Sequence, residues 1–298
     1  MSKIITCITL FLLGVTPLLA QSFDCALLSN GTFSVCDQFS DGDFTTNPTW
    51  AGDATQFVVN ASSQLQSNGT GTDTAYLSTP ATLGSEWRFY FKMAFAPSDN
   101  NKMRVYLASD QNNLTAPLNG YFLDMGENGT TDAIKLYRQD GATLALLATG
   151  AAGTLATNPE MTIKVNRSTA GLWQVYTGSI LGTDYNLDIT TTDNTYTTSA
   201  NMGVWCKYTS SNANKFSFDN FYVGDAIVDN APPQVSSLEV LDANTVQICF
   251  SEIISAVEAE NPTNYTLNGS LVPNTVNINA NETCVTAAFT TPFAQGNN

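Results

Sequence analysis

The strongest constraint on this chain is a strict alternation of apolar and polar side chains. Along residues 87–95 every second side chain is Trp, Phe or Met, and Arg88 and Lys92 stand between them. Successive side chains of a β-strand point to opposite faces. The segment therefore predicts a long strand with one buried face and one solvated face.

The same alternation returns at shorter length along the sequence. Further candidate strands are residues 103–107, 121–125, 133–137, 161–165, 173–176, 202–208 and 216–223. Turn sequences such as Glu127-Asn128-Gly129 separate them. Beyond residue 20, no stretch combines helical periodicity with a good cap. Many strands joined by short polar turns predict an all-β antiparallel sandwich.

A domain boundary is expected around residues 225–233, because the Pro232-Pro233 pair cannot occupy a central strand. From Ile227 onward there is no Lys or Arg, and all 4 Trp residues precede this point. The segment beyond it alternates again. A seven-stranded sandwich takes roughly 100 residues, so the second domain, residues 233–298, is expected to be truncated.

The N-terminus has the pattern of a secretory signal peptide over residues 1–20. Lys3 precedes an apolar run at 4–19, and Ala20 precedes the expected cleavage point. No later stretch has the length of a membrane span. The chain is therefore expected to be exported, either secreted or at the cell surface, and not to span the membrane after signal removal.

Two cysteines lie close to the expected mature N-terminus. Cys25 and Cys36 flank an Asn30-Gly31 turn. In an oxidising compartment they are predicted to form a disulfide, with two free thiols as the alternative.

The other mature cysteines lie on predicted strands. Cys249 and Cys284 both point away from the apolar face of their strands. They are predicted to form a cross-strand disulfide, which requires that those strands be neighbours in register, with two unpaired thiols on separate strands as the alternative. Cys206 shares a face with apolar residues. It is predicted to be a buried free thiol.

Charge and composition exclude several functions. The chain has 11 Lys and Arg against 26 Asp and Glu, a net charge of -15. This balance argues against nucleic acid as a partner, because phosphate binding needs a basic surface. The sequence contains 0 His, which excludes Ser-His-Asp catalysis and His-ligated metals.

Several segments carry a family resemblance. Residues 37–50 (DQFSDGDFTTNPTW), 118–122, 136–141, 203–209 and 216–223 resemble a concanavalin-A-like (laminin-G-like) jelly roll of secreted Bacteroidota proteins. Residues 246–252 and 261–267 are similar to the Ig-like repeat of bacterial surface-layer proteins. Such modules often precede lamin-tail domains.

The resemblance covers residues 37–298 and implies a domain order. An N-terminal segment (21–36) leads into the jelly roll (37–226), and a linker (227–232) precedes a partial Ig-like β-sandwich (233–298). Fold alone does not assign activity.

The acidic residues do not predict catalysis. Glycosidases with this fold carry paired acids spaced ExDxxE on one strand, and this spacing is absent. Glu86, Glu127 and Glu160 are isolated. No catalytic residue is predicted, and the chain is not expected to be an enzyme.

Four aspartates are candidate calcium ligands. Asp37, Asp41 and Asp43 bracket the opening strand of the jelly roll, and Asp219 lies on the closing strand. These strands are commonly neighbours, so the oxygens could hold a structural calcium ion. Turn capping by aspartates beside Gly42 is the alternative. No other cofactor is expected.

Three aromatic residues are candidates for a ligand platform. Trp205, Tyr90 and Tyr106 could share an open sheet face, where aromatic rings can stack on sugars. Ordinary packing between two sheets is the alternative.

Two functions fit these observations. The first is a non-catalytic exported module that binds an extracellular glycan or surface component through the jelly roll, with the Ig-like domain as a spacer. The alternative is an accessory N-terminal region of a larger exported hydrolase or nuclease. A catalytic motif encoded downstream of Asn298 would favour the second.

Overall fold

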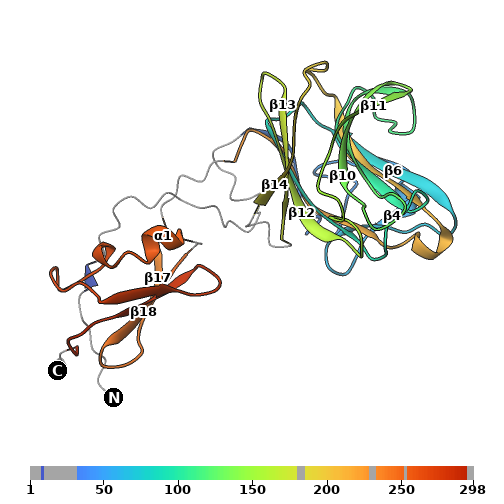
Figure 1. Cartoon of the computed structure of the whole chain (residues 1–298). Coiled ribbons are helices and arrows are strands. Elements are labelled where there is room, and N and C mark those ends of the chain that lie inside the picture. Colours follow the sequence, from blue (N-terminus) through green and yellow to red (C-terminus); the bar gives the residue numbers. More distant parts are fainter. Residues whose placement is uncertain (1–7, 10–31, 180–184, 228–232, 252–253, 294–298) are drawn as a thin grey trace. The chain divides into compact units, whose positions relative to one another are not determined.

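The computed structural model describes residues 8–9, 32–179, 185–227, 233–251 and 254–293. The chain divides into two compact units, one of residues 22–227 and one of residues 1–21 with 228–298 (Figure 1). Regular structure in the described residues is almost entirely β-strand. The predicted all-β class is therefore confirmed. No helix in these residues has the length and apolar character needed to cross a bilayer.

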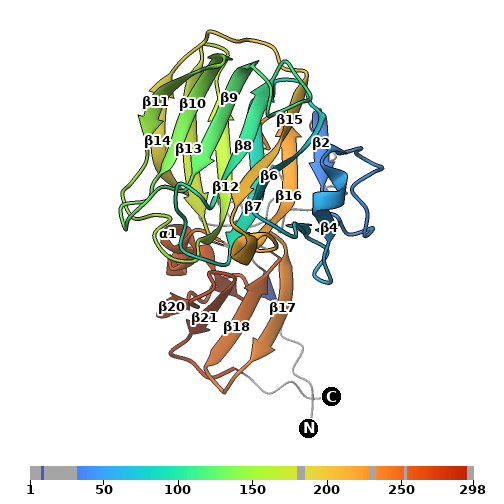
Figure 2. The ribbon, with the colours of Figure 1, turned by 90° about the vertical axis from the view of Figure 1, so that its right-hand side faces the viewer.

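Two antiparallel sheets build the larger unit, as far as residues 32–227 are described (Figure 2). The front sheet has the order β11 (Thr143–Thr149), β10 (Ile134–Gly141), β9 (Leu118–Met125), β8 (Lys102–Ser109), β15 (Asn201–Tyr208), β6 (Asp73–Pro80) and β3 (Ala51–Gly52). The back sheet has the order β14 (Tyr185–Thr192), β13 (Leu172–Gly178), β12 (Glu160–Arg167), β7 (Glu86–Met93), β16 (Phe216–Gly224), β5 (Leu65–Ser67) and β4 (Phe57–Val59), and β2 (Phe33–Asp37) also pairs with β16. Two short 3-10 turns, η2 (Ala54–Gln56) and η3 (Ser210–Asn212), complete this jelly-roll sandwich.

The core lies between the two sheets and follows the alternation in the sequence. In β8, Met103, Val105 and Leu107 are buried against the back sheet. Across the core, the ring of Tyr121 on β9 packs on the ring of Trp173 on β13, with centroids 4.7 Å apart. Large aromatic side chains bury the most apolar area per residue. Packing between the inward-facing rings therefore holds the two sheets together.

Strand β7 differs from its prediction, because its second face is also buried. Arg88 is only 7% exposed, and it forms an ion pair with Glu86 on the same face. β7 lies in the middle of the back sheet, between β12 and β16. The guanidinium of Arg88 also lies 5.8 Å from the ring centroid of Tyr185 on β14. The predicted solvated face is therefore a packed polar layer.

The opening and closing strands of the sandwich are neighbours. Asp37 of β2 is in register with Phe221 of β16. The Phe221 ring contacts the ring of Trp50, with centroids 5.0 Å apart. This arrangement fixes the start of the sandwich to its end.

The smaller unit contains a four-stranded sheet and a two-stranded one in its described residues, and the four-stranded sheet is the main one. Its order is β17 (Val235–Val240), β18 (Thr245–Phe250), β21 (Cys284–Ala288) and β20 (Thr275–Ile278). Short elements accompany it: α1 (Ala256–Ala259), η4 (Pro262–Asn264) and β19 (Thr266–Leu267), which pairs with β1 (Ile8–Thr9). Apart from β1, the predicted signal peptide lies outside the described residues. The Ig-like assignment of this unit stays a prediction.

Candidate functional site

The outer face of the front sheet carries the side chains that alternate with the core residues along each strand. In β8 the inward residues alternate with Lys102, Arg104 and Tyr106, which point away from the core. The neighbouring strands β15, β9 and β10 contribute their outward residues beside these positions. The result is one continuous surface over the middle of the sheet.

A single row of side chains crosses this surface on five adjacent strands. Tyr76 of β6 is in register with Trp205, Trp205 with Arg104, Arg104 with Asp124, and Asp124 with Lys135. We call these five residues the cation–aromatic row. Side chains directly opposite each other on neighbouring strands lie close enough to interact, so the register alone places aromatic rings beside charges.

Arg104 is the centre of the row. Its guanidinium carbon lies 4.6 Å from the ring centroid of Phe122 and 4.9 Å from that of Trp205. Its Nε donates to Oδ1 of Asp124 at 2.7 Å, and Nζ of Lys102 donates to Oδ2 at 2.8 Å. Burial lowers the pKa of Arg104, but the Asp124 carboxylate and Tyr106 raise it by more. Arg104 is therefore a fixed cation between two rings.

One end of the face is closed by a loop. Leu114 and Leu118 pack with Tyr106 and Phe122, and all four side chains are buried. Tyr137 stacks on Phe122 with ring centroids 5.3 Å apart and an interplanar angle of 6°. Leu114 lies directly over β15, where a Cβ on Gly203 would come within 2.7 Å of its Cδ1. Of the aromatic residues on this face, Tyr76, Trp205 and Tyr137 therefore remain half-buried and reachable.

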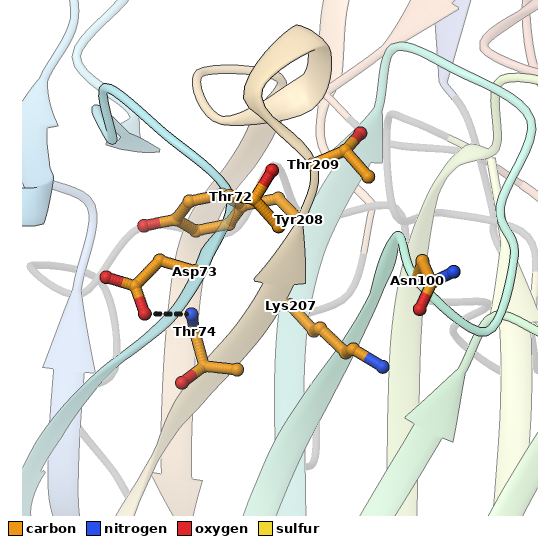
Figure 3. A pocket seen from close by; sticks show the side chains of 7 residues that line it. All are labelled: Thr72, Asp73, Thr74, Asn100, Lys207, Tyr208 and Thr209. Atoms are coloured by element: carbon orange, nitrogen blue, oxygen red, sulfur yellow. Dashed lines mark hydrogen bonds between the residues drawn. The ribbon is translucent and has the colours of Figure 1, made fainter.

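The opposite end of the face opens into a hollow of about 430 Å³ (Figure 3). Its lining residues are Thr72, Asp73, Thr74, Asn100, Lys207, Tyr208 and Thr209. Thr74 and Lys207 are cross-strand partners, and each is two residues from a ring of the row, Tyr76 or Trp205. The hollow and the row therefore form one surface. Its volume lies within the usual range of about 300–1,000 Å³ for small-molecule sites.

The three predicted platform residues do not lie together. Trp205 and Tyr106 are on the front sheet as expected, although Tyr106 is buried beneath the loop and donates to Gln139 at 3.2 Å. Tyr90 is on β7 of the back sheet, where its hydroxyl donates to Glu160 at 2.7 Å. A platform that includes Tyr90 is therefore wrong, because the sequence does not say which sheet a strand joins.

The four predicted calcium ligands do not make a metal site. Asp37 accepts hydrogen bonds from the backbone N–H of Phe39 at 2.8 Å and from Nε1 of Trp50 at 2.8 Å. Asp43 accepts from Thr45 and Thr46, and Asp41 accepts from the backbone N–H of Asp43. Within the described part of the chain, no group of three or more Asp, Glu, Cys or His side chains could hold a metal ion. These oxygens serve N–H and O–H donors, as the capping alternative expects, so the residues do not fit calcium.

Asp37 and Asp219 nevertheless both have raised pKa values, and the charge of Asp37 contributes to the shift of Asp219. Burial raises the pKa of Asp37 to about 6, although hydrogen bonds from Phe39 and Trp50 oppose the shift. Burial also raises the pKa of Asp219 to about 7, and the nearby charge of Asp37 adds to it. Strands β2 and β16 therefore carry two carboxyl groups that are weaker acids than usual.

The predicted cysteine chemistry can be followed on the described residues. Cys249 and Cys284 are in register on β18 and β21 and form a disulfide, with Cα atoms 4.0 Å apart. Cys206 is buried and free, which confirms its prediction, and burial raises its pKa. Cys36 is disulfide-bonded. Cys25 lies outside the described residues, so its pairing stays a prediction.

Sequence reasoning did not identify most of this surface. Tyr76, Arg104, Asp124, Tyr137 and Lys207 were not among the predicted site residues. For Arg104 and Tyr137 the signal was present in the alternation of polar residues along the segments 102–109 and 134–141. What was missing was the strand order, because β6 and β15 lie far apart in sequence and meet only in the folded sheet.

No protein-family model and no curated protein matches the sequence. Among solved structures, the VIP36 exoplasmic/lumenal domain in a Ca2+/Man2-bound form is 12% identical, with a TM-score of 0.48 over 66% of this chain and 89% of that one. The Emp47p carbohydrate recognition domain is 13% identical, with a TM-score of 0.48 over 68% of this chain and 99% of that one. A legume lectin-like domain from Entamoeba histolytica is 10% identical, with a TM-score of 0.45 over 62% of this chain and 92% of that one.

Proposed function

We propose that this chain is a non-catalytic, exported carbohydrate-binding protein that uses the outer face of the front sheet. The observation that carries the proposal is the cation–aromatic row running into the hollow. Half-buried Tyr76 and Trp205 offer apolar ring surface, and the hydroxyl, amide and charged groups of the hollow lie next to them. Ligand sites typically combine apolar contact area with a few placed polar groups.

A sugar matches this mixture of surfaces. One face of a pyranose ring is lined by C–H groups that pack on an aromatic ring, and its edge carries hydroxyl groups that need hydrogen-bond partners. Thr74 and Asn100 supply neutral partners in the hollow, and Lys207 supplies a charged one. Export is supported by the signal-peptide pattern and by the Cys249–Cys284 disulfide, because disulfides persist in oxidising compartments. In this proposal the chain serves adhesion, and the smaller unit acts as a spacer.

Binding of the purified full chain to a glycan array, followed by calorimetry on the best ligand, tests the proposal. Trp205→Ala should weaken binding by about tenfold or more, as expected for an aromatic side chain that the ligand covers. Tyr176→Ala is the matched control, because Tyr176 is a half-buried aromatic on the back sheet. Circular dichroism should show that both variants fold. The proposal fails if no glycan binds, or if the two variants lose affinity equally.

A further inference from the structure

Positive charge accumulates where the row meets the hollow. Lys207 of β15 is in register with Lys102 of β8, and Arg104 is the next outward residue of β8. We call Lys102, Arg104 and Lys207 the cationic corner. Like charges directly opposite each other on neighbouring strands are destabilising, so this placement needs compensation.

The carboxylates around the cationic corner offset only part of the repulsion among its three cations. Asp124 is the carboxylate that pairs with both Lys102 and Arg104. Nζ of Lys207 donates to the backbone carbonyl oxygen of Asp99 at 3.0 Å, and no ion pair to Lys207 occurs among the described residues. Two of the three cations therefore share one carboxylate and the third has no ion pair in the described part of the chain, although the net charge of the chain is -15.

The other acidic residues nearby are directed elsewhere. The Asp99 carboxylate bonds to the side chain of Asn128. Asp73 is the cross-strand partner of Tyr208, which is a core residue. The side chains of Asp73 and Thr74 therefore point to opposite faces of the sheet. In Figure 3 the amino group of Lys207 extends toward Asn100 and away from the carboxylate of Asp73. The half of the hollow between Lys207 and Asn100 is therefore suited to an anion.

We infer that the ligand of this face is an acidic glycan, whose sugar ring lies on Trp205 and whose carboxylate or sulfate group binds Lys207. This inference rests on the proposed function. A charge-assisted hydrogen bond from an ammonium group is stronger than a neutral one, and an anion at Lys207 relieves the repulsion within the cationic corner. Carboxylate and sulfate share this chemistry, and the probes below separate them.

Calorimetry on the full chain tests the inference with three oligosaccharides: a galacturonan hexamer, its neutral methyl ester, and a sulfated galactan hexamer. At least one acidic probe should bind, and its affinity should fall as salt rises from low to high concentration, because salt screens exposed charges. The methyl ester should bind about tenfold more weakly than the free galacturonan if a carboxylate is recognised, since one such bond corresponds to about that factor. Binding of the sulfated probe alone would identify a sulfate ester as the anion.

Lys207→Gln provides the residue-level test. It should reduce binding of the acidic probe about tenfold, and it should remove the preference for the acidic probe over the neutral methyl ester. Lys92→Gln is the control, because Lys92 pairs with Glu160 on the back sheet. Equal binding of acidic and neutral probes, unaffected by Lys207→Gln, overturns the inference and leaves the proposed function intact. Failure of every probe and every arrayed glycan to bind overturns the proposed function itself.

Discussion

The two units of this chain use the same strand pattern but bury it to different degrees. In the sandwich, Trp87 and Trp173 are fully buried between two sheets. In the smaller unit, Leu238 and Val240 are in register with the core residues Ile248 and Val246, yet they remain 44% and 39% exposed. Alternation thus specifies which side chains share a face, and burial requires a second layer over that face.

The largest expected effect is in the sandwich core. Trp173→Ala removes a ring that contacts both Trp87 and Tyr121, at 5.5 Å and 4.7 Å between centroids. Truncation of a buried aromatic side chain costs about 3–5 kcal/mol of unfolding free energy. Urea unfolding followed by fluorescence measures the loss, because all 4 Trp residues belong to this unit. A loss below about 1 kcal/mol would show that the second layer contributes little.

The next effect concerns the smaller unit. Replacing both Cys249 and Cys284 with Ala removes a cross-link between residues 35 positions apart, which should cost about 3–4 kcal/mol by freeing the unfolded chain. Hydrogen exchange of residues 233–293 should accelerate, while the fluorescence transition of the sandwich stays unchanged. A shifted fluorescence transition would mean that the two units unfold together. Substitution is preferable to reductant, which would also act on the disulfide of Cys36.

A smaller effect on stability comes from the raised pKa values of two aspartates on the neighbouring strands β2 and β16. The folded state holds the protons of Asp37 and Asp219 more tightly than the unfolded chain does, since their pKa values rise to about 6 and about 7. Their stabilising contribution is therefore complete below about pH 4, and it is lost as the pH rises through the two folded pKa values.

Asp219→Asn should remove part of the loss of folding stability that occurs as the pH rises. At pH 8 the variant should be more stable than the natural chain by on the order of 1 kcal/mol, and at pH 4 the two should be alike. Unfolding by urea at both pH values gives the comparison, with Asp41→Asn as an exposed control. Equal pH dependence of the natural chain and Asp219→Asn would contradict the assignment.

The smallest effect is expected on the exposed edge strand β17. Leu238→Ala should change the unfolding free energy of the smaller unit by no more than about 0.5 kcal/mol, as for other surface substitutions. Ile248→Ala, its buried partner in register, should cost about 2–5 kcal/mol. Hydrogen exchange of β18 and β21 reports both. Similar losses would show that Leu238 is covered in solution.

The parts of the fold that the sequence predicts are those that depend on local pattern. Strand positions and the inward parity of β8 follow from alternation, and the Cys249–Cys284 bond follows from the parity of two strands. The burial of the second face of β7 could not be predicted from alternation. Arg88 is charged and is therefore expected to be solvated, and its contacts with Glu86 and Tyr185 are known only from the structure. Tyr90 was misplaced for a related reason, since strand order across the two sheets is a property of the whole chain.

The clamped guanidinium of Arg104 has a consequence for binding kinetics and entropy. An arginine side chain normally loses up to about 2 kcal/mol of rotamer freedom when it is immobilised. Here Phe122, Trp205 and Asp124 have already immobilised it during folding. Under the proposed function, a ligand at the row would meet a preorganised surface, because Arg104 would lose little further freedom on binding. Differences in affinity between ligands should therefore appear mainly in how long each one stays bound.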